Sequence, residues 1–210
     1  MKVLLINGSP REKGCTYTAL SEVAKTLKEE GIETEIFHIG SKSVQSCTAC
    51  YKCADGSRRC IIDDKVNEIL KKADEIDGLI IGSPVHYAAA SGGITAFLGR
   101  LFFASAGAFA YKPGAAVVSA RRAGTTAALD QLNKFFPISG MPIVPSQYWN
   151  MVHGSSPEDV QKDAEGMQIM RTLGRNMAWM LKSFEAAKKS GVTLPKKEDR
   201  RERTNFIRQS

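Results

Sequence analysis

Short apolar runs alternate with segments of helical spacing along most of this chain, and this alternation restricts the fold more than any other feature. The apolar runs predict five buried strands, at Lys2–Asn7, Thr34–Ile39, Gly78–Gly82, Ala115–Ser119 and Met141–Val144. Helical spacing follows around Leu20–Leu27 and at Lys65–Ala73, Ile94–Phe103, Thr125–Phe135 and Asp163–Ala187. Strands that alternate with helices form βαβ units, which predicts an α/β fold with a doubly wound, five-stranded parallel sheet in three α/β/α layers.

The size and charge of the chain favour one domain with a basic tail. The 210 residues are 43% hydrophobic, so the chain can form one core without a covalent cross-link. The formal net charge is +7, but eight Lys and Arg against three Asp and Glu fall in residues 188–210, which leaves +2 for residues 1–187. We therefore expect a domain over residues 1–187, a basic C-terminal extension over 188–210, and no nucleic-acid binding.

The N-terminal stretch MKVLLINGSP has only five apolar residues, too few for a signal peptide or a membrane span. We expect a cytoplasmic protein that has no membrane partner. In a reducing compartment, clustered thiols usually serve metal or redox chemistry rather than structural disulfides.

The loop after the first strand reads NGSPREKGCTYTAL and runs directly into a helix. Gly8 and Gly14 allow tight backbone paths, Ser9 and Thr16 offer hydroxyls, and Arg11 offers a charged donor. At a helix N-terminus this set indicates a phosphate-binding loop, although an ordinary capped turn stays open. The spacing matches neither the P-loop of NTPases nor the G-x-G-x-x-G of dinucleotide-binding folds.

The loop after the third strand, GSPVHYAAASGGITAFLGR, places planar side chains at the same edge of the sheet. Pro84 favours an extended path, and His86 and Tyr87 could lie against a flat ligand. For His86 alone, an ordinary solvent-facing loop position is the alternative.

The loop after the fourth strand, SARRAGTTAAL, again combines glycine and hydroxyls before a helix. Arg121 and Arg122 are candidate partners for an anion, and one of them is expected to be surface only.

Together, GSPREKGCT, GSPVHYAAASGG and SARRAGTT resemble the NADPH-dependent FMN reductase family of flavodoxin-like proteins over roughly residues 1–187. The resemblance implies a flavodoxin-like fold that binds FMN. It implies phosphate contacts from Ser9, Arg11 and Thr16, with Cys15 standing where Asn or Ser is usual. It implies contacts to the flavin ring from Pro84, Val85, His86 and Tyr87, and to its far edge from Ser119, Arg121, Gly124 and Thr125.

The activity that this resemblance implies is an FMN-dependent NAD(P)H oxidoreductase, which passes electrons to a small-molecule or protein acceptor. Because the flavin carries the chemistry, no catalytic acid or base is expected from the protein. An electron carrier without nicotinamide activity is the alternative, and a regulatory module that senses flavin is a third. We also expect a homodimer or homotetramer, since Phe102, Phe103 and Phe109 lie close together in the sequence and the tail carries the segment TNFIR.

Four of the five cysteines lie in SCTACYKCADGSRRCIIDD, residues 46–64. Their spacing, C-x2-C-x2-C-x6-C over Cys47, Cys50, Cys53 and Cys60, can curl around a compact cluster, as the C-x2-C-x2-C run of ferredoxins does. Zinc and free thiols that shape a ligand pocket stay open. The segment also resembles the cysteine motif of the iron–sulfur flavoprotein branch, which implies a [4Fe-4S] cluster on these four residues, with Cys15 outside it.

Overall fold

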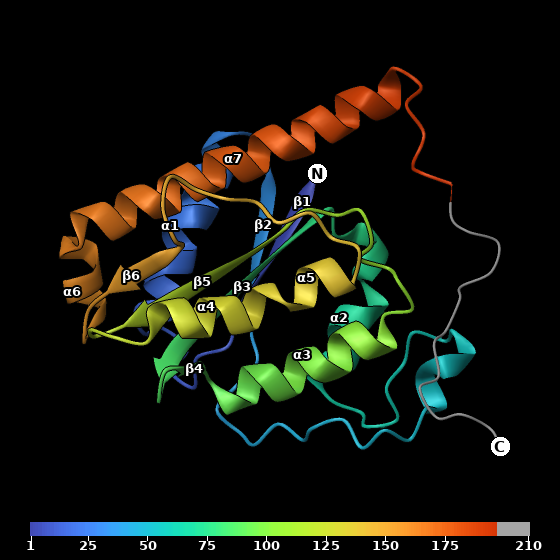
Figure 1. Ribbon diagram of the computed structural model, residues 1–210, viewed down its shortest axis with the longest axis horizontal. Coiled ribbons are helices and arrows are strands. Elements are labelled where there is room, and N and C mark those ends of the chain that lie inside the picture. Colours follow the sequence, from blue (N-terminus) through green and yellow to red (C-terminus); the bar gives the residue numbers. More distant parts are fainter. Residues whose placement is uncertain (197–210) are drawn as a thin grey trace, which may run out of the picture.

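A twisted parallel sheet forms the centre of the computed structural model, which describes residues 1–196 (Figure 1). Its strands are β1 (Lys2–Asn7), β2 (Glu33–His38), β3 (Gly78–His86), β5 (Gly114–Ala120) and β6 (Met151–His153). They are all parallel, in the order β2-β1-β3-β5-β6, and the short β4 (Ala89–Ala90) pairs antiparallel with the end of β3. Leaving β4 aside, this is the strand order of flavodoxin-like folds, so the predicted fold is confirmed.

The register of the central strands brings the three predicted loops to one edge. Asn7 pairs with Gly82 across β1 and β3, and Pro84 pairs with Ser119 across β3 and β5. The chain reverses its winding direction at the β1/β3 boundary, where ligands bind in doubly wound sheets.

The fifth strand is not where the sequence predicted it. Residues 141–144 form only an isolated parallel bridge, Gly114 to Ile143, whereas the regular strand is Met151–His153. Pro142 and Pro145 flank that bridge, and proline has no N–H for a ladder, so the pairing cannot extend on either side.

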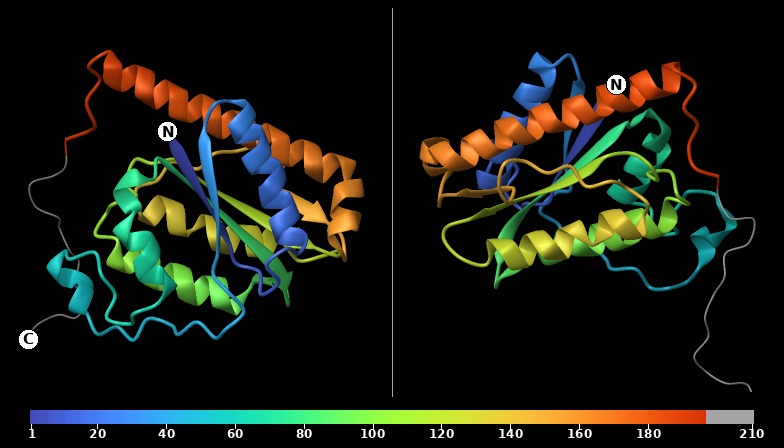
Figure 2. Two further views of the ribbon diagram at one scale, coloured as in Figure 1. Left: turned by 180° about the vertical axis from the view of Figure 1, so that it is seen from behind. Right: turned by 45° about the horizontal axis from the view of Figure 1, so that its top comes forward.

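Helices cover both faces of the sheet (Figure 2). One layer holds α1 (Cys15–Glu29), α6 (Pro157–Lys162) and α7 (Ala164–Lys189). The other holds α2 (Lys65–Lys71), α3 (Gly92–Ala104), α4 (Thr125–Asn133) and α5 (Phe135–Ile138). Two 3₁₀ turns, η1 (Lys52–Asp55) and η2 (Ala73–Glu75), complete the described elements. Among residues 1–196, no helix combines the length and the apolar character that crossing a bilayer requires.

The final helix continues two residues past the predicted domain boundary at residue 187. The segment TNFIR, which we expected to support self-association, lies outside the described residues.

The strands alternate their side chains between two separate cores. Leu4 and Ile6 pack beneath the α2–α5 layer, whereas Val3 and Leu5 pack against α1 and α7. The apolar face of α7, which includes the buried Met170 and Met177, packs into the second core. Because each core has its own helical layer, the sheet is buried on both sides, as parallel sheets require.

Two helical glycines offer a matched test of this packing. A Cβ on Gly174 of α7 would lie 2.8 Å from the Thr26 Cβ and 3.2 Å from the Val23 carbonyl oxygen of α1, whereas a Cβ on Gly99 of α3 would meet nothing within 4 Å. We expect Gly174→Ala to lower the free energy of unfolding by about 1–3 kcal/mol through overpacking. Gly99→Ala should raise it by roughly 0.5–1 kcal/mol through better helix propensity. Urea unfolding measures the free energy of unfolding of each variant, provided that the m-values stay unchanged. Equal effects of the two substitutions would contradict this account.

Candidate functional site

The loop after β1 presents an uncapped helix N-terminus at the edge of the sheet. The N-cap of α1 is Gly14, the described residues provide no side-chain cap there, and the first turn has no acidic residue. The first N–H groups of a helix lack intrahelical acceptors and carry a partial positive charge. An anion is the natural partner for such an end, so the phosphate-loop interpretation fits the structure.

The backbone of this loop is held by close polar contacts. The Gly8 N–H donates to the Gly82 carbonyl at 2.8 Å, and the Ser91 hydroxyl donates to the Gly8 carbonyl at 2.9 Å. The His38 Nε2 donates to the Ser9 carbonyl at 2.8 Å, which fixes the ring tautomer that carries its proton there. These contacts set the path of the loop before any ligand binds.

The predicted phosphate residues occupy three different environments. Ser9 is buried and its hydroxyl accepts from the Arg11 N–H at 3.1 Å, while the Arg11 side chain is exposed. Thr16 is buried, and its hydroxyl lies 2.8 Å from the Ser119 hydroxyl on β5. Cys15 is half-buried with its sulfur 3.7 Å from the Gly154 carbonyl, and burial raises the pKa of its thiol. The Thr16–Ser119 contact thus joins the first and third loops.

The second loop is a tight β-hairpin whose tip points into solvent. β3 and β4 pair through Val85 and His86, and the two tip residues, Tyr87 and Ala88, have φ of 51° and 58°. Tyr87 and His86 are exposed, whereas Pro84 and Val85 are half-buried. A left-handed tyrosine is strained, and such strain is typically retained at functional sites.

The third loop packs directly against that hairpin. Gly124, with φ of 88°, is the N-cap of α4, and a Cβ there would lie 2.7 Å from the Ala88 Cα and 3.1 Å from the Val85 Cγ1. Thr125 is buried behind Gly124, whereas Arg121 and Arg122 are both exposed. The structure therefore brings all three predicted loops together, with a second uncapped helix N-terminus at α4.

The four clustered cysteines line one pocket at the far end of α3. This pocket is walled by Cys47, Cys50, Cys53, Cys60, Arg100 and Phe103, together with neighbouring residues of the loop. All five cysteines of the chain are free thiols, and Cys15 contacts a different part of the fold. Within residues 1–196, no group of three or more His, Cys, Asp or Glu side chains already stands in metal-binding geometry. The structure gathers the predicted ligands in one place without closing them around a centre.

Backbone conformation and charge distinguish the cysteines of this pocket. Ala49 and Tyr51 lie on either side of Cys50 and have φ of 52° and 56°. Their left-handed backbone coils the loop tightly. Burial raises the pKa of the Cys53 thiol, and the neighbouring cysteines add to that rise. The Lys52 backbone N–H lowers the pKa of the exposed Cys50 thiol.

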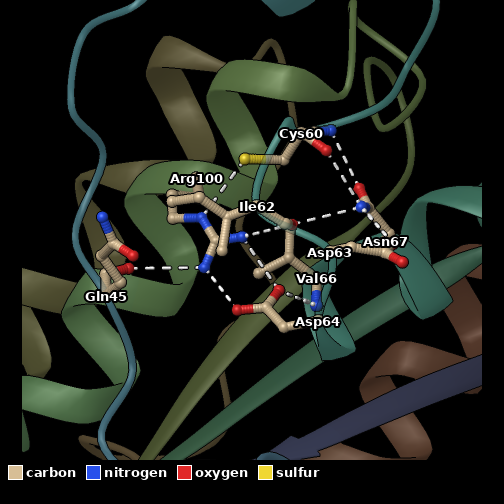
Figure 3. Close-up of polar contacts among 8 residues, drawn as sticks. All are labelled: Gln45, Cys60, Ile62, Asp63, Asp64, Val66, Asn67 and Arg100. Carbon is tan, nitrogen blue, oxygen red and sulfur yellow. Dashed lines mark hydrogen bonds and ion pairs between the residues drawn. The ribbon is translucent and has the colours of Figure 1, made fainter.

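A partly buried polar cluster ties the cysteine loop to the core (Figure 3). Arg100, on α3, forms a two-pronged ion pair with Asp64, with Nη1–Oδ2 at 2.6 Å and Nη2–Oδ1 at 2.9 Å. The Asn67 side chain accepts from the Cys60 N–H at 2.8 Å and donates to the Cys60 carbonyl at 3.0 Å. Asp64 also caps α2 by accepting from the Val66 N–H.

Sequence reasoning missed this cluster and the residues that brace the first loop, His38 and Ser91. The sequence does contain a signal for Arg100, because it lies between Phe97 and Ala104 on the apolar stripe of ITAFLGRLFFA. A lone charge on a buried helix face needs a partner, and that requirement points to a buried ion pair.

Comparison with known proteins agrees with this geometry. Residues 1–156 match the family model described as NADPH-dependent FMN reductase. An iron–sulfur flavoprotein of Methanocaldococcus jannaschii is 36% identical over 194 residues, covering 87% of this chain and 98% of the relative. An iron–sulfur flavoprotein of Methanosarcina thermophila is 28% identical over 189 residues, covering 88% and 97%.

Among solved structures, RosB with bound 8-demethyl-8-formylriboflavin 5′-phosphate superposes with a TM-score of 0.72, at 14% identity, over 100% of this chain and 98% of RosB. That likeness concerns the fold. The family match and the first relative together settle the membership: the chain belongs to the NADPH-dependent FMN reductase family and is similar along most of its length to the iron–sulfur flavoproteins.

Proposed function

We propose that this chain is an FMN-dependent NAD(P)H oxidoreductase that passes electrons to a small-molecule or protein acceptor, with a [4Fe-4S] cluster on its four clustered cysteines. The observation that carries the flavin part is the convergence of three loops on the uncapped N-terminus of α1, at the β1/β3 switch point. Family membership supports the cofactor.

The residues present fit FMN. The first-turn N–H groups of α1 and the Arg11 guanidinium can hold the phosphate, with Ser9, Cys15 and Thr16 around them. The flavin ring would lie along the hairpin, on Pro84, Val85, His86 and Tyr87. Its far edge would meet Ser119, Arg121, Gly124 and Thr125.

The protein's part in the reaction is binding and exclusion of water. When bound, FMN would supply the redox chemistry, because its ring can accept a hydride from NAD(P)H and pass the electrons on to an acceptor. The exposed Tyr87 at the hairpin tip offers a planar surface that can cover the ring, and the Gly124–Ala88 contact fixes how far the hairpin can move inward.

The donor set of the second site fits an iron–sulfur cluster. Thiolates are the ligands of such clusters, and four thiols line one pocket here. The name that the M. jannaschii relative carries supports the same assignment. Cys47, Cys50, Cys53 and Cys60 would be the ligands.

We also propose that the chain self-associates, on fewer residues than the sequence analysis suggested. Phe109 is buried and Phe102 is half-buried, so neither is available as we expected. Phe103 is exposed and forms an edge-to-face pair with the exposed Tyr51, their centroids 5.9 Å apart, at the rim of the cysteine pocket. A second copy of the chain would cover this pair and shield the pocket.

FMN binding can be tested through its phosphate. We expect the purified protein to bind FMN and to oxidise NADPH or NADH when mixed with it anaerobically. Arg11→Gln should weaken FMN binding roughly tenfold, because a hydrogen bond to a charged group is lost. Titration with riboflavin, which lacks the phosphate, should show no difference between this variant and the wild type.

Lys13→Gln is the matched control, since it removes an exposed charge from the same loop. Equal losses for both variants would contradict a specific role of Arg11. Flavin binding without nicotinamide oxidation would instead favour the electron-carrier alternative.

The cysteine site can be tested by metal content. Anaerobic reconstitution with iron and sulfide should give about four iron atoms per chain. Cys50→Ala should lose most of this iron, whereas Cys15→Ala should keep it, because Cys15 lies away from the pocket. Tight zinc binding without iron uptake would indicate a zinc site, and no metal in either assay would indicate free thiols.

The proposed self-association can be tested by measuring the oligomeric state. Light scattering at micromolar concentration should give the mass of a dimer or tetramer, and Phe103→Ser should shift that mass toward the monomer. Ile138→Ser is the matched control, because Ile138 is exposed at the end of α5, and it should leave the mass unchanged. Phe135, at the other end of α5, packs against the core and would not serve. A monomeric wild type would overturn the proposal.

A further inference from the structure

Arg100 is the one arginine among the described residues whose side chain is completely buried. It lies on the core-facing side of α3, with Phe97 and Leu101 as buried neighbours. Burying a guanidinium is costly unless each of its donors finds a partner. Where those donors go therefore indicates what the residue is for.

The contacts of Arg100 all lead to the cysteine loop. Its two Nη atoms bind the Asp64 carboxylate, and they also donate to the Ile62 carbonyl at 3.0 Å and the Gln45 carbonyl at 3.4 Å. The remaining donor, Nε–H, points to the Cys60 sulfur, with Nε–Sγ at 3.4 Å (Figure 3). One side chain thus holds both ends of the loop and touches a thiol directly.

Cys60 is consequently the most firmly placed of the four clustered cysteines. Its N–H and its carbonyl both bind the Asn67 side chain, and its sulfur receives the Arg100 donor. Cys47 and Cys50, by contrast, are exposed.

We infer that Arg100 is a positioning residue for the iron–sulfur cluster, which orients the Cys60 sulfur as a ligand and raises the reduction potential of the cluster. The inference rests on the proposed function, because it assumes that the four cysteines hold the cluster. A hydrogen bond to a ligand sulfur and a nearby positive charge both stabilise the more negative, reduced state of a cluster. A purely structural role, in which Arg100 only neutralises Asp64, would leave the potential unchanged.

Two substitutions separate these roles because they should move the potential in opposite directions. Arg100→Gln removes the positive charge beside Cys60 and should shift the potential to a more negative value. Asp64→Asn removes the opposing negative charge and should shift it to a more positive value. Asn is also a good N-cap, so the start of α2 is retained in the second variant.

Arg58→Gln is the matched control. Arg58 belongs to the same loop and pairs with an aspartate, Asp74, at 2.6 Å, but that pair is exposed, and Arg58 donates to a carboxylate rather than to a sulfur. This variant should keep the wild-type potential.

The experiment is a redox titration of the full-length, anaerobically reconstituted protein, in which the visible spectrum of the cluster reports its oxidation state. Iron content and FMN content are measured on the same samples. Opposite shifts for Arg100→Gln and Asp64→Asn, with no shift for Arg58→Gln, support the inference. Iron-loaded variants that all titrate like the wild type overturn it while the cluster proposal stands.

A wild-type protein that takes up no iron overturns both proposals. Should Arg100→Gln fail to fold, Arg100→Lys replaces it: lysine keeps the positive charge but has no Nε–H to donate to the Cys60 sulfur, so a shift of the potential to a more negative value supports the role of Arg100, and an unchanged value overturns it.

Discussion

The close approach of α1 and α3 to the sheet at Gly8 and Gly82 is the constraint on which the rest of the molecule depends. A Cβ on Gly8 would lie 2.6 Å from the Ile94 Cβ, and a Cβ on Gly82 would lie 2.7 Å from the Leu20 Cδ1 and 2.8 Å from the Thr16 Cγ2. Both helical layers therefore press against the sheet at its switch point. Without side chains there, α1 can begin right beside the strand end, which leaves its uncapped N-terminus at the edge of the sheet for the proposed phosphate.

Helix α3 connects the two proposed redox sites. Its N-cap, Ser91, donates to the Gly8 carbonyl in the loop after β1, and Arg100 lies about 14 Å further along the axis, at the cysteine pocket. Figure 1 shows the helix running from β4 toward η1. A single rigid element thus fixes the relative placement of the loops that would hold the flavin and the cysteines.

The sequence predicted the parts of this design that follow from local patterns. Alternation of apolar runs identified the sheet, and glycine and hydroxyl spacing identified the three loops. It failed at the fifth strand, because apolar content does not reveal that Pro142 and Pro145 interrupt pairing. The Thr16–Ser119 hydroxyl contact joins residues 103 apart in sequence, and the Arg100–Asp64 pair joins residues from separate elements. The apolar stripe signals that Arg100 needs a partner, but no local pattern identifies which residues pair.

The cysteine loop differs from the sheet in how it would open. Only Cys53 and Cys60 reach the edge of a core, while Cys47 and Cys50 are exposed. The left-handed backbone at Ala49 and Tyr51 adds conformational strain to the loop. Its amides should exchange with solvent through local opening, whereas those of β1, β3 and β5 exchange only on global unfolding. All fully buried residues of the two cores lie outside this loop, so we expect loading of the proposed cluster to be a binding event on a folded protein and not, as in zinc fingers, the step that creates the fold.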